Sequence, residues 1–246
     1  MKRQSTEPVK VLVLDVGGSH VKCIASGRRV PVRFRSGPKL TPARMVRNVL
    51  KVTSGWRYDA VSIGYPGVVH NDRIVREPHN LGLGWVDFDF QAAFGCPVRI
   101  INDAAMQALG SYAGGKMLFL GLGTGLGSTL IVDDVIAPLE LGHLRYGNGR
   151  DYEDYVGEKA RRRLGNKKWR RKVKHVVDGF RKALLPEYIV LGGGNAAHLK
   201  RLPAGTRRVA NACAFLGGFR LWKRQTRDAA GQARGEHARR VDAAPP

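Results

Sequence analysis

Two segments of the chain place clustered glycines directly after an apolar run. Asp15–Ser19 follows residues 11–14, and Gly123–Gly127 follows residues 117–122. Glycine allows a turn to adopt positive φ and lets its backbone approach a ligand closely. Successive turn amides form a concavity that binds anions, among which phosphates are frequent. Two such turns predict a site that holds a phosphate chain from both sides, and therefore phosphoryl transfer.

Two better-known phosphate motifs are matched only in part. Residues 110–117 have the glycine spacing of a P-loop, but Met117 stands where the magnesium-binding hydroxyl is required, and the segment precedes a strand instead of following one. Residues 123–128 resemble a dinucleotide fingerprint, but residues 129–132 predict a strand where that motif needs a helix. The sequence therefore argues against a P-loop NTPase and against a nicotinamide-dependent enzyme.

Asp15 ends the first apolar run and stands just before the glycines. An aspartate here can cap its own turn. It can equally hold hydrated Mg²⁺ beside a phosphate chain, because Mg²⁺ prefers oxygen ligands and keeps several waters. In the second case Ser19 and Lys22 would offer a hydroxyl and a cation to the same phosphates. The residues alone leave both interpretations of Asp15 open.

Asn102 and Asp103 stand where a predicted strand ends and a helix begins. Asp103 is a good helix N-cap, and it would also serve as the carboxylate that accepts a proton from a hydroxyl when a kinase phosphorylates it. Further along, Glu140 and His143 fit a surface turn, half of a metal site or hydrogen bonding to sugar hydroxyls. Because no cysteine or second histidine stands at ligand spacing, we favour the sugar over the metal.

The elements that must position these residues form two similar halves. Each half contains a strand, a glycine turn and a second strand, which predicts two α/β lobes with a cleft between them. The predicted strands are residues 11–15, 21–25, 30–34, 60–63, 98–101, 117–122, 129–132 and 188–191, and the predicted helices are residues 41–55, 103–113, 159–182 and 207–222.

The composition is ordinary for a globular protein, with 43% hydrophobic and 25% charged residues in 246. No apolar run approaches the ~20 residues of a membrane span, and the charged start lacks a signal-peptide core, so we expect a cytoplasmic protein without membrane contact. The three cysteines, Cys23, Cys96 and Cys213, are isolated and predict reduced thiols.

The charge, by contrast, is unusual, because 42 lysines and arginines against 20 acids give a net charge of +22. Twelve of the basic residues fall within residues 159–182, where Asp178 is the single acid. Apolar side chains recur there at helical spacing, so one face packs and the other presents cations. That second face is either simply solvated or binds a polyanion such as nucleic acid, and the charge run does not decide between them.

Taken in order along residues 9–220, the motifs resemble those of the ROK family of sugar kinases. No single motif is specific, whereas the ordered set is. It consists of Asp15-x-Gly17-Gly18-Ser19, Pro66-Gly67, Asn80-Leu81 with Trp85, Asn102-Asp103, Gly123-Thr124-Gly125, Glu140-x-Gly142-His143 and Gly192-Gly193-Gly194.

The resemblance implies an actin-like, hexokinase-like α/β fold, in which two ribonuclease-H-like lobes close on a cleft. We expect lobes at residues 1–114 and 115–205, a helix at about 206–222 that returns to the first lobe, and a disordered tail at 223–246. The family also implies a homodimer.

Carried over by position, the resemblance implies a base, a sugar-binding set and three donor loops. Asp103 would deprotonate the 6-hydroxyl of a hexose, and Asp15 would hold Mg²⁺ with the donor. The sugar-binding set would be Gly67, Asn80, Asn102, Glu140, His143 and Glu153. The donor loops would be Asp15, Gly17, Gly18 and Ser19 with Lys22 beside them, then Gly123, Thr124 and Gly125, and finally Gly192, Gly193 and Gly194.

Two departures narrow the choice within the family. Residues 147–151 contain no cysteine, so we expect no structural zinc. About eight residues precede the first predicted strand, so we also expect no helix-turn-helix domain of the kind that repressor members carry. The short form is most similar to the polyphosphate glucokinase branch, which fits the basic charge. We therefore expect phosphorylation of glucose by polyphosphate, ATP or both. A kinase for another hexose, such as N-acetylmannosamine or fructose, and a catalytically silent polyanion-binding protein are the alternatives.

Overall fold

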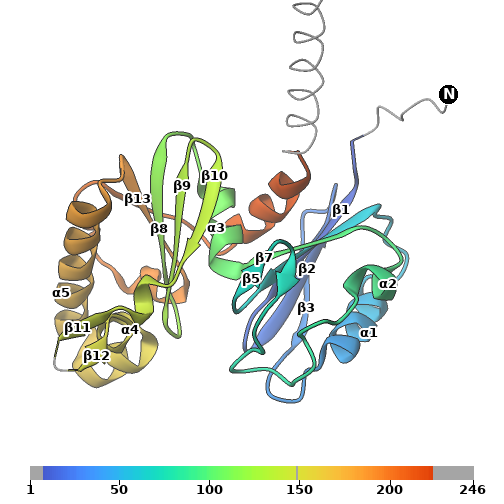
Figure 1. Ribbon diagram of the computed structural model, residues 1–246, viewed down its shortest axis with the longest axis horizontal. Coiled ribbons are helices and arrows are strands. Elements are labelled where there is room, and N and C mark those ends of the chain that lie inside the picture. The colour runs from blue at the N-terminus through green and yellow to red at the C-terminus, as the bar shows by residue number, and fades with distance from the viewer. Residues whose placement is uncertain (1–7, 148, 224–246) are drawn as a thin grey trace, which may run out of the picture.

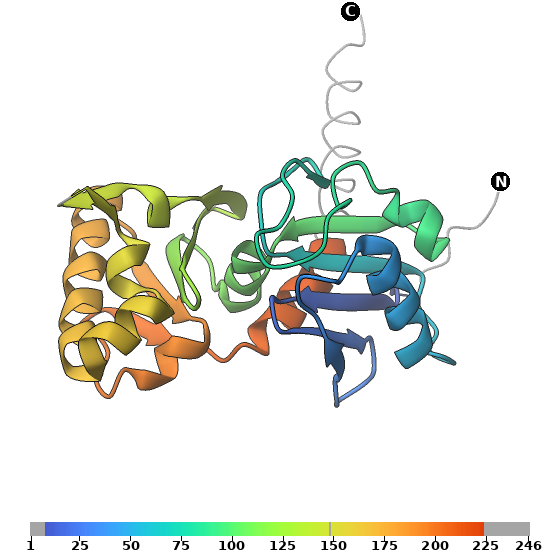
Figure 2. The same cartoon turned by 90° about the horizontal axis from the view of Figure 1, so that it is seen from below.

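The computed structural model describes residues 8–147 and 149–223, which fold into two lobes (Figure 1, and from below in Figure 2). Each lobe is built on a mixed five-stranded sheet. Helix α3 (Asp103–Ser111) lies between the sheets, since Ala104 and Ala108 pack against the second sheet and Met106 packs against the first. The predicted two-lobed α/β architecture is confirmed.

The strands of lobe 1 run in the order β3-β2-β1-β4-β7. β1, β4 and β7 are parallel neighbours, and β2 and β3 extend the sheet antiparallel on the other side of β1. β1 and β4 are buried along their whole length, which accounts for their continuous apolar sequence. The bounds are β1 (Val11–Val16), β2 (His20–Ala25), β3 (Val32–Arg35), β4 (Ala60–Tyr65) and β7 (Val98–Asn102).

The carboxyl ends of the three parallel strands meet at one edge of this sheet. Asp15 of β1 pairs in register with Gly64 of β4, and Tyr65 pairs with Asn102 of β7. Ligands of open α/β sheets bind outside this edge. The register therefore brings together the glycine turn after β1, the Pro66–Gly67 turn and the start of α3.

The two faces of β1 pack against different elements. Leu12 and Leu14 face a core that includes Met45 of α1 (Pro42–Val52), while Val11 and Val13 face α3 and residues 213–223. Helix α1 begins as predicted. Thr41 is its N-cap, with a side chain that accepts from the Arg44 amide. The shorter elements of this lobe are α2 (Phe90–Phe94), β5 (Val69–His70) and β6 (Arg73–Ile74).

Lobe 2 repeats the topology of lobe 1, with the strand order β10-β9-β8-β13-β14. β8 is antiparallel to β9 and parallel to β13, as β1 is to β2 and β4. Gly192 at the end of β13 lies opposite Gly121 of β8, so the second and third glycine turns share one edge. The bounds are β8 (Lys116–Leu122), β9 (Leu126–Val132), β10 (Val135–Leu139), β13 (Tyr188–Gly192) and β14 (Thr206–Arg208).

The predicted basic helix is α5 (Glu158–Leu184), which is interrupted at Gly165 by a non-helical φ of 70°. Its inner face is apolar and buried, including Trp169, Val173 and Phe180. No helix within residues 8–147 and 149–223 has the length and apolar character to cross a membrane. The remaining elements are η1 (Leu141–His143), β11 (Arg145–Gly147), β12 (Arg150–Asp151), α4 (Glu153–Val156) and η2 (Gly194–His198).

The last predicted helix is shorter than the sequence indicates. Residues 206–208 form β14, parallel to β13, and the helix begins only at residue 213. Pairing with a strand edge outweighs the local helical pattern here, which is a tertiary effect. The strand predicted from Val30 likewise begins at Val32, where pairing with β2 starts. The tail predicted at 223–246 lies, apart from residue 223, outside the described residues.

Residues 213–223 return to lobe 1 and cross α3 at two glycines. A Cβ placed on Gly110 would meet the Cys213 carbonyl, and one placed on Gly217 would meet the Met106 carbonyl, both well under 3.0 Å. The buried Ser62 hydroxyl of β4 donates to the Gly218 carbonyl at 2.7 Å. The two helices therefore touch backbone to backbone, and this contact fixes α3 against lobe 1.

Gly217→Ala is expected to destabilise the fold by about 3 kcal/mol or more, because the added methyl has no flexible neighbour to displace. Gly179→Ala is the matched control. Gly179 lies on the exposed face of α5 with no atom within 4 Å of an added Cβ, so the control gains about 0.5–1 kcal/mol from reduced backbone entropy. Urea unfolding measures both, and equal stability of the two variants contradicts the packing argument.

Candidate functional site

β7 ends at Asn102 and α3 begins at Asp103, so this junction positions the Asp103 side chain. The Asn102 side chain caps α3 by accepting from the Ala105 amide at 3.1 Å, and its Nδ2 donates to the Gly67 carbonyl at 3.0 Å. Asn102 thus ties the Pro66–Gly67 turn to the start of the helix. Asp103 follows as the first helical residue and accepts from the Ala104 amide at 2.7 Å through Oδ1. No hydrogen bond among the described residues uses its Oδ2.

The electrostatic environment of Asp103 is unfavourable for a carboxylate. Burial is the main cause that raises its pKa to about 7, and the negative charges of Asp15 and Glu140 raise it further, against a lowering effect of the Ala104 amide. The side chain is half-buried, so it keeps access to solvent. Asp15 belongs to lobe 1 and Glu140 to lobe 2, so acidic groups of both lobes raise the pKa of Asp103. A carboxyl with a pKa near neutrality is suited to accept a proton.

Asp15 lies one strand away from this junction, at the end of β1. Its carboxylate accepts from the Lys22 ammonium at 3.0 Å, and the two residues are directly opposite in the β1–β2 pair. The Asp15 side chain is 12% exposed and that of Lys22 is 36% exposed. Lys22 therefore neutralises Asp15 in part, and the second Asp15 oxygen, which has no hydrogen-bond partner among the described residues, is available to a cation.

The first glycine turn has an internal frame and free amides. The Gly17 amide donates to the His20 carbonyl at 3.0 Å, and the Ser36 hydroxyl donates to the Gly17 carbonyl. Within the described part of the chain the amides of Gly18 and Ser19 make no hydrogen bond. They are available to an anion beside Asp15.

The second glycine turn joins β8 to β9 and is held by Asn195 and by the first residue of α5. The Gly123 carbonyl accepts from the Asn195 side chain at 2.9 Å and from the Glu158 amide at the start of α5 at 3.0 Å. The amides of Thr124 and Gly125 have no partner among the residues described. Like the first turn, this one is fixed through its carbonyls and leaves amides for a ligand.

The third glycine turn, Gly192–Gly194, packs against the second. Gly193 has a φ of +81°, and an added Cβ there would meet the Leu122 carbonyl, so glycine is required on both counts. Beyond it lies a hollow of about 390 Å³ between η2 and the segment after β14. The hollow is lined by Gly193, Gly194, Ala196, Ala197, Arg208, Val209, Ala210 and Asn211.

The predicted sugar-binding residues come from both lobes. Asn80 lies against the first glycine turn, with its Cβ 3.4 Å from a Cβ placed on Gly18. Glu153 lies against Gly125 and Gly142 of lobe 2 and so connects the second glycine turn to the Glu140–His143 segment. His143 Nε2 lies 3.5 Å from Glu140 Oε2, and both side chains are more than half exposed. A ligand that contacts all of these residues must bridge the lobes.

A hollow larger than the one beside Gly193 lies elsewhere. It measures about 600 Å³ and lies at the far end of lobe 1 around Trp56, Tyr58 and Cys96. None of the predicted site residues lines it. Volume alone therefore does not locate the candidate site, whereas the convergence of carboxylates and free amides does.

Sequence reasoning missed Glu77, which orders the loop that carries Asn80. Its carboxylate accepts from three consecutive backbone amides, those of Gly84, Trp85 and Val86, at 3.0–3.2 Å. Trp85 is fully buried beside Tyr65, so the loop is anchored at both its backbone and its core. A single glutamate in an irregular segment carries no pattern that predicts this clamp.

The residues at the first glycine turn fit Mg²⁺ bound with a phosphate chain. No group of three or more histidine, cysteine or acidic side chains capable of holding a metal occurs within the described ranges. Mg²⁺ held together with phosphates needs only one or two carboxylates, because waters and phosphate oxygens complete its shell. The Asp15 oxygen that Lys22 leaves unbonded among the described residues supplies that single carboxylate donor.

Comparison with known proteins places this arrangement in context. The ROK family model matches residues 11–144, more than half of the chain. Comparison with curated protein sequences gives no match.

Among solved structures, an inorganic polyphosphate/ATP-glucomannokinase from Arthrobacter sp. strain KM is similar, with a TM-score of 0.74 and 24% identity over 88% of this chain and 99% of the other. A ROK family glucokinase from Streptomyces griseus aligns with a TM-score of 0.70 and 17% identity, covering 87% and 99% of the two chains. A ROK transcriptional regulator, a homologue of the E. coli MLC protein, aligns with a TM-score of 0.69 and 15% identity, covering 88% and 78%. These likenesses establish the shared fold.

Asp103→Asn is expected to stabilise the protein at neutral pH. The folded pKa of about 7 exceeds the unfolded value of about 3.9, so the unfolded state loses its proton first as pH rises. Wild-type stability therefore falls, relative to the variant, between pH of about 4 and 7, and the difference is constant above that. After a discount for partial exposure it should reach about 2 kcal/mol. Urea unfolding across this range, without Mg²⁺, measures it, and a difference that does not change with pH contradicts the assignment.

Glu77→Ala is expected to lower stability by about 2 kcal/mol, because three backbone amides lose their acceptor. It should also weaken sugar binding through displacement of Asn80. Asp89→Ala is the control, because it removes the N-cap of α2 in the same lobe, where Asp89 accepts from the Ala92 amide at 2.9 Å. It should lower stability by about 1 kcal/mol and leave the affinity for sugar unchanged. Calorimetric titration with glucose compares the two, and equal affinities contradict the role of the clamp.

Proposed function

The chain belongs to the ROK family. Because Asp103 has a pKa of about 7 and two glycine turns offer unbonded amides within the described residues, we propose that the protein is a sugar kinase of the cytoplasm. The reaction would transfer a phosphoryl group to the 6-hydroxyl of a hexose, with glucose as the first candidate. The observation that carries this proposal is the position of Asp103 at the sheet edge where β1 presents Asp15 beside the first glycine turn, with a pKa that Asp15 and Glu140 raise. A catalytically silent polyanion binder would not need this arrangement.

Asp103 is the proposed general base. Its unbonded Oδ2 would take the proton of the sugar 6-hydroxyl as the oxygen forms its bond to the terminal phosphorus of the donor, while the bond from that phosphorus to the bridging oxygen breaks. The hydrogen bonds of Asn102 to Ala105 and Gly67 keep the base at the strand end during this step. Asn80, Glu140, His143 and Glu153 would hold the sugar hydroxyls.

The donor would lie across the two glycine turns. The amides of Gly18, Ser19, Thr124 and Gly125 point to no other partner among the described residues, and such amides stabilise phosphate charge at little reorganisation cost. Asp15 would hold Mg²⁺ at the donor phosphates, where the ion neutralises charge as the terminal phosphoryl group leaves. Lys22 would keep Asp15 oriented.

ATP is the donor that the structure favours. The hollow of about 390 Å³ beside Gly193 and Gly194 is within the ~300–1,000 Å³ of small-molecule sites and lies where a nucleoside attached to the phosphates would extend. Inorganic polyphosphate is the second candidate donor, supported by the likeness to the Arthrobacter glucomannokinase and by the basic charge. A coupled assay with ATP and with polyphosphate, on glucose, mannose, fructose and N-acetylmannosamine, tests both choices.

Asp103→Asn is expected to lower kcat by about 10²–10⁴-fold and to leave the affinity for sugar nearly unchanged, since only proton acceptance is lost. The wild-type rate should fall as pH drops through about 7, where the base becomes protonated, and the residual rate of the variant should lack this acid limb. Asp134→Asn, in the exposed β9–β10 turn, is the control with normal activity. Near-normal turnover of Asp103→Asn refutes the base, and no phosphorylated sugar from any donor refutes the kinase.

A further inference from the structure

The outward face of α5 beyond Gly165 carries a basic stripe. Four of its exposed cations fall within residues 167–174, on the side away from the buried Trp169, Val173 and Val177, and the fifth follows eight residues later. They are Lys167, Lys168, Arg171, Lys174 and Lys182. The apolar face of the helix is fully used in the core of lobe 2, so the stripe is not a packing surface of its own lobe.

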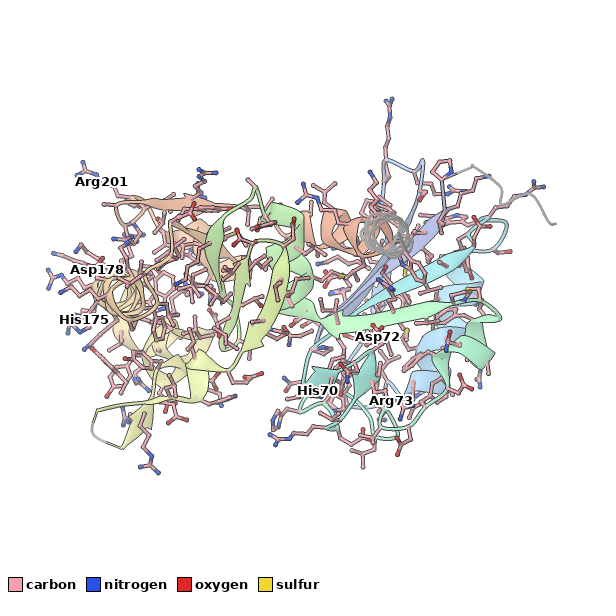
Figure 3. The ribbon with its side chains drawn as sticks, turned by 45° about the horizontal axis from the view of Figure 1, so that its top comes forward. His70, Asp72, Arg73, His175, Asp178 and Arg201 are labelled. Atoms are coloured by element: carbon pink, nitrogen blue, oxygen red, sulfur yellow. The ribbon has the colours of Figure 1, made fainter. Side chains whose placement is uncertain are left out.

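Two arginines at the edge of the stripe fix a neighbouring loop. Arg170 donates to the His198 carbonyl at 2.7 Å, and Arg181 donates to the Ala204 carbonyl. The loop between these carbonyls carries Lys200 and Arg201, both exposed. We name the five helix cations and these two loop cations together the basic face. Figure 3 places Arg201, Asp178 and His175 on the side of lobe 2 away from lobe 1.

The basic face holds far more positive than negative charge. Asp178 is the only acid of the helix on this side, and it pairs with Lys174 and Arg181 at 2.7 and 3.4 Å. No ion pair or hydrogen bond within the described residues engages the side chains of five other cations. These are Lys167, Lys168, Arg171, Lys200 and Arg201. Such mutual repulsion costs stability, and an external polyanion would relieve it.

The basic face is separate from the candidate kinase site. The first residue of α5 contacts the second glycine turn through the Glu158 amide, but the stripe begins only after the break at Gly165, on a helix that lies at the side of lobe 2 away from lobe 1 (Figure 1). A ligand on it would therefore leave the glycine turns open. Binding at the basic face accordingly does not depend on the proposed kinase reaction.

We propose that the basic face binds the phosphate backbone of double-stranded nucleic acid. Residues 167–182 span about 22 Å at ~1.5 Å per residue, which matches several phosphates of a strand at ~3.4 Å each. An anionic membrane fits less well, because an interfacial helix needs an exposed apolar face and that of α5 is buried. Single strands are bound mainly by stacking on aromatic side chains. The ring exposed on this face is that of His175, which already packs against Tyr146.

The binding should be independent of base sequence. The side chains of the basic face are lysines and arginines on a helix whose other face is anchored in the core, so they meet phosphates and do not enter a groove. Its strength should then come from counterion release and fall steeply with salt.

The test is fluorescence anisotropy of a labelled DNA duplex of about 20 base pairs with the full-length chain, between about 50 and 200 mM salt. The variant K167Q/K168Q/R171Q should bind about tenfold more weakly, or worse. Its slope of log affinity against log salt should be less negative by about 3, since each lost phosphate contact removes ~0.9. The control R29Q/R47Q/K51Q removes the same charge from exposed positions of lobe 1 and should change affinity less than about twofold.

The unfolding midpoint of both variants verifies that they are folded. Equal loss of duplex binding in the two variants, or no loss in either, overturns the proposal. A competition arm distinguishes the source of the phosphates: unlabelled duplex should displace the probe at a lower phosphate concentration than inorganic polyphosphate does. If polyphosphate displaces it at the lower concentration, the face belongs to that ligand and the nucleic-acid assignment is wrong.

Discussion

The site depends on the parallel register of β1, β4 and β7, which places two carboxylates near each other at one sheet edge. Asp15 ends β1 and Asp103 follows β7, and the charge of the first raises the pKa of the second. Two such groups cannot both be ionised without cost in a partly desolvated place. The surrounding features reduce that cost: Lys22 pairs with Asp15, the Ala104 amide donates to Asp103, and free amides face the same edge.

The two lobes share one topology but present different groups at the corresponding sheet edge. In lobe 1 the edge presents carboxylates and a helix start, whereas in lobe 2 the corresponding edge presents two glycine turns that pack against each other. Lobe 2 also links the proposed phosphate-binding and sugar-binding residues, because Glu153 lies against both the second glycine turn and the Glu140–His143 segment. A shift of one lobe relative to the other would therefore move proposed donor and sugar contacts together.

Much of this could be predicted from the sequence, since the signals are local. Continuous apolar runs followed by glycines gave β1 and β8 correctly, and Thr41–Pro42 gave the start of α1. Long-range contacts left no such signal. β14 forms because residues 206–208 meet the edge of β13, and Glu77 matters because an irregular loop folds back to bring three of its amides to the carboxylate. The basic face could be predicted in part. The helical pattern indicated which cations face outward, but it did not indicate that Arg170 and Arg181 donate to carbonyls of a neighbouring loop.

The helix that presents Asp103 is held at both ends by charge. At its start the proposed base benefits from the positive end of the helix dipole, and at its end Arg220 donates to the carbonyls of Leu109 and Tyr112 at 2.7 and 2.9 Å. Arg220 belongs to the helix that crosses α3 at Gly110 and Gly217. The same helix therefore caps the end of α3 and fixes α3 to lobe 1. A carboxylate that costs stability needs a rigid support, because a looser helix would relieve the strain by moving Asp103 into solvent. The close glycine crossing therefore preserves the raised pKa on which the proposed chemistry rests.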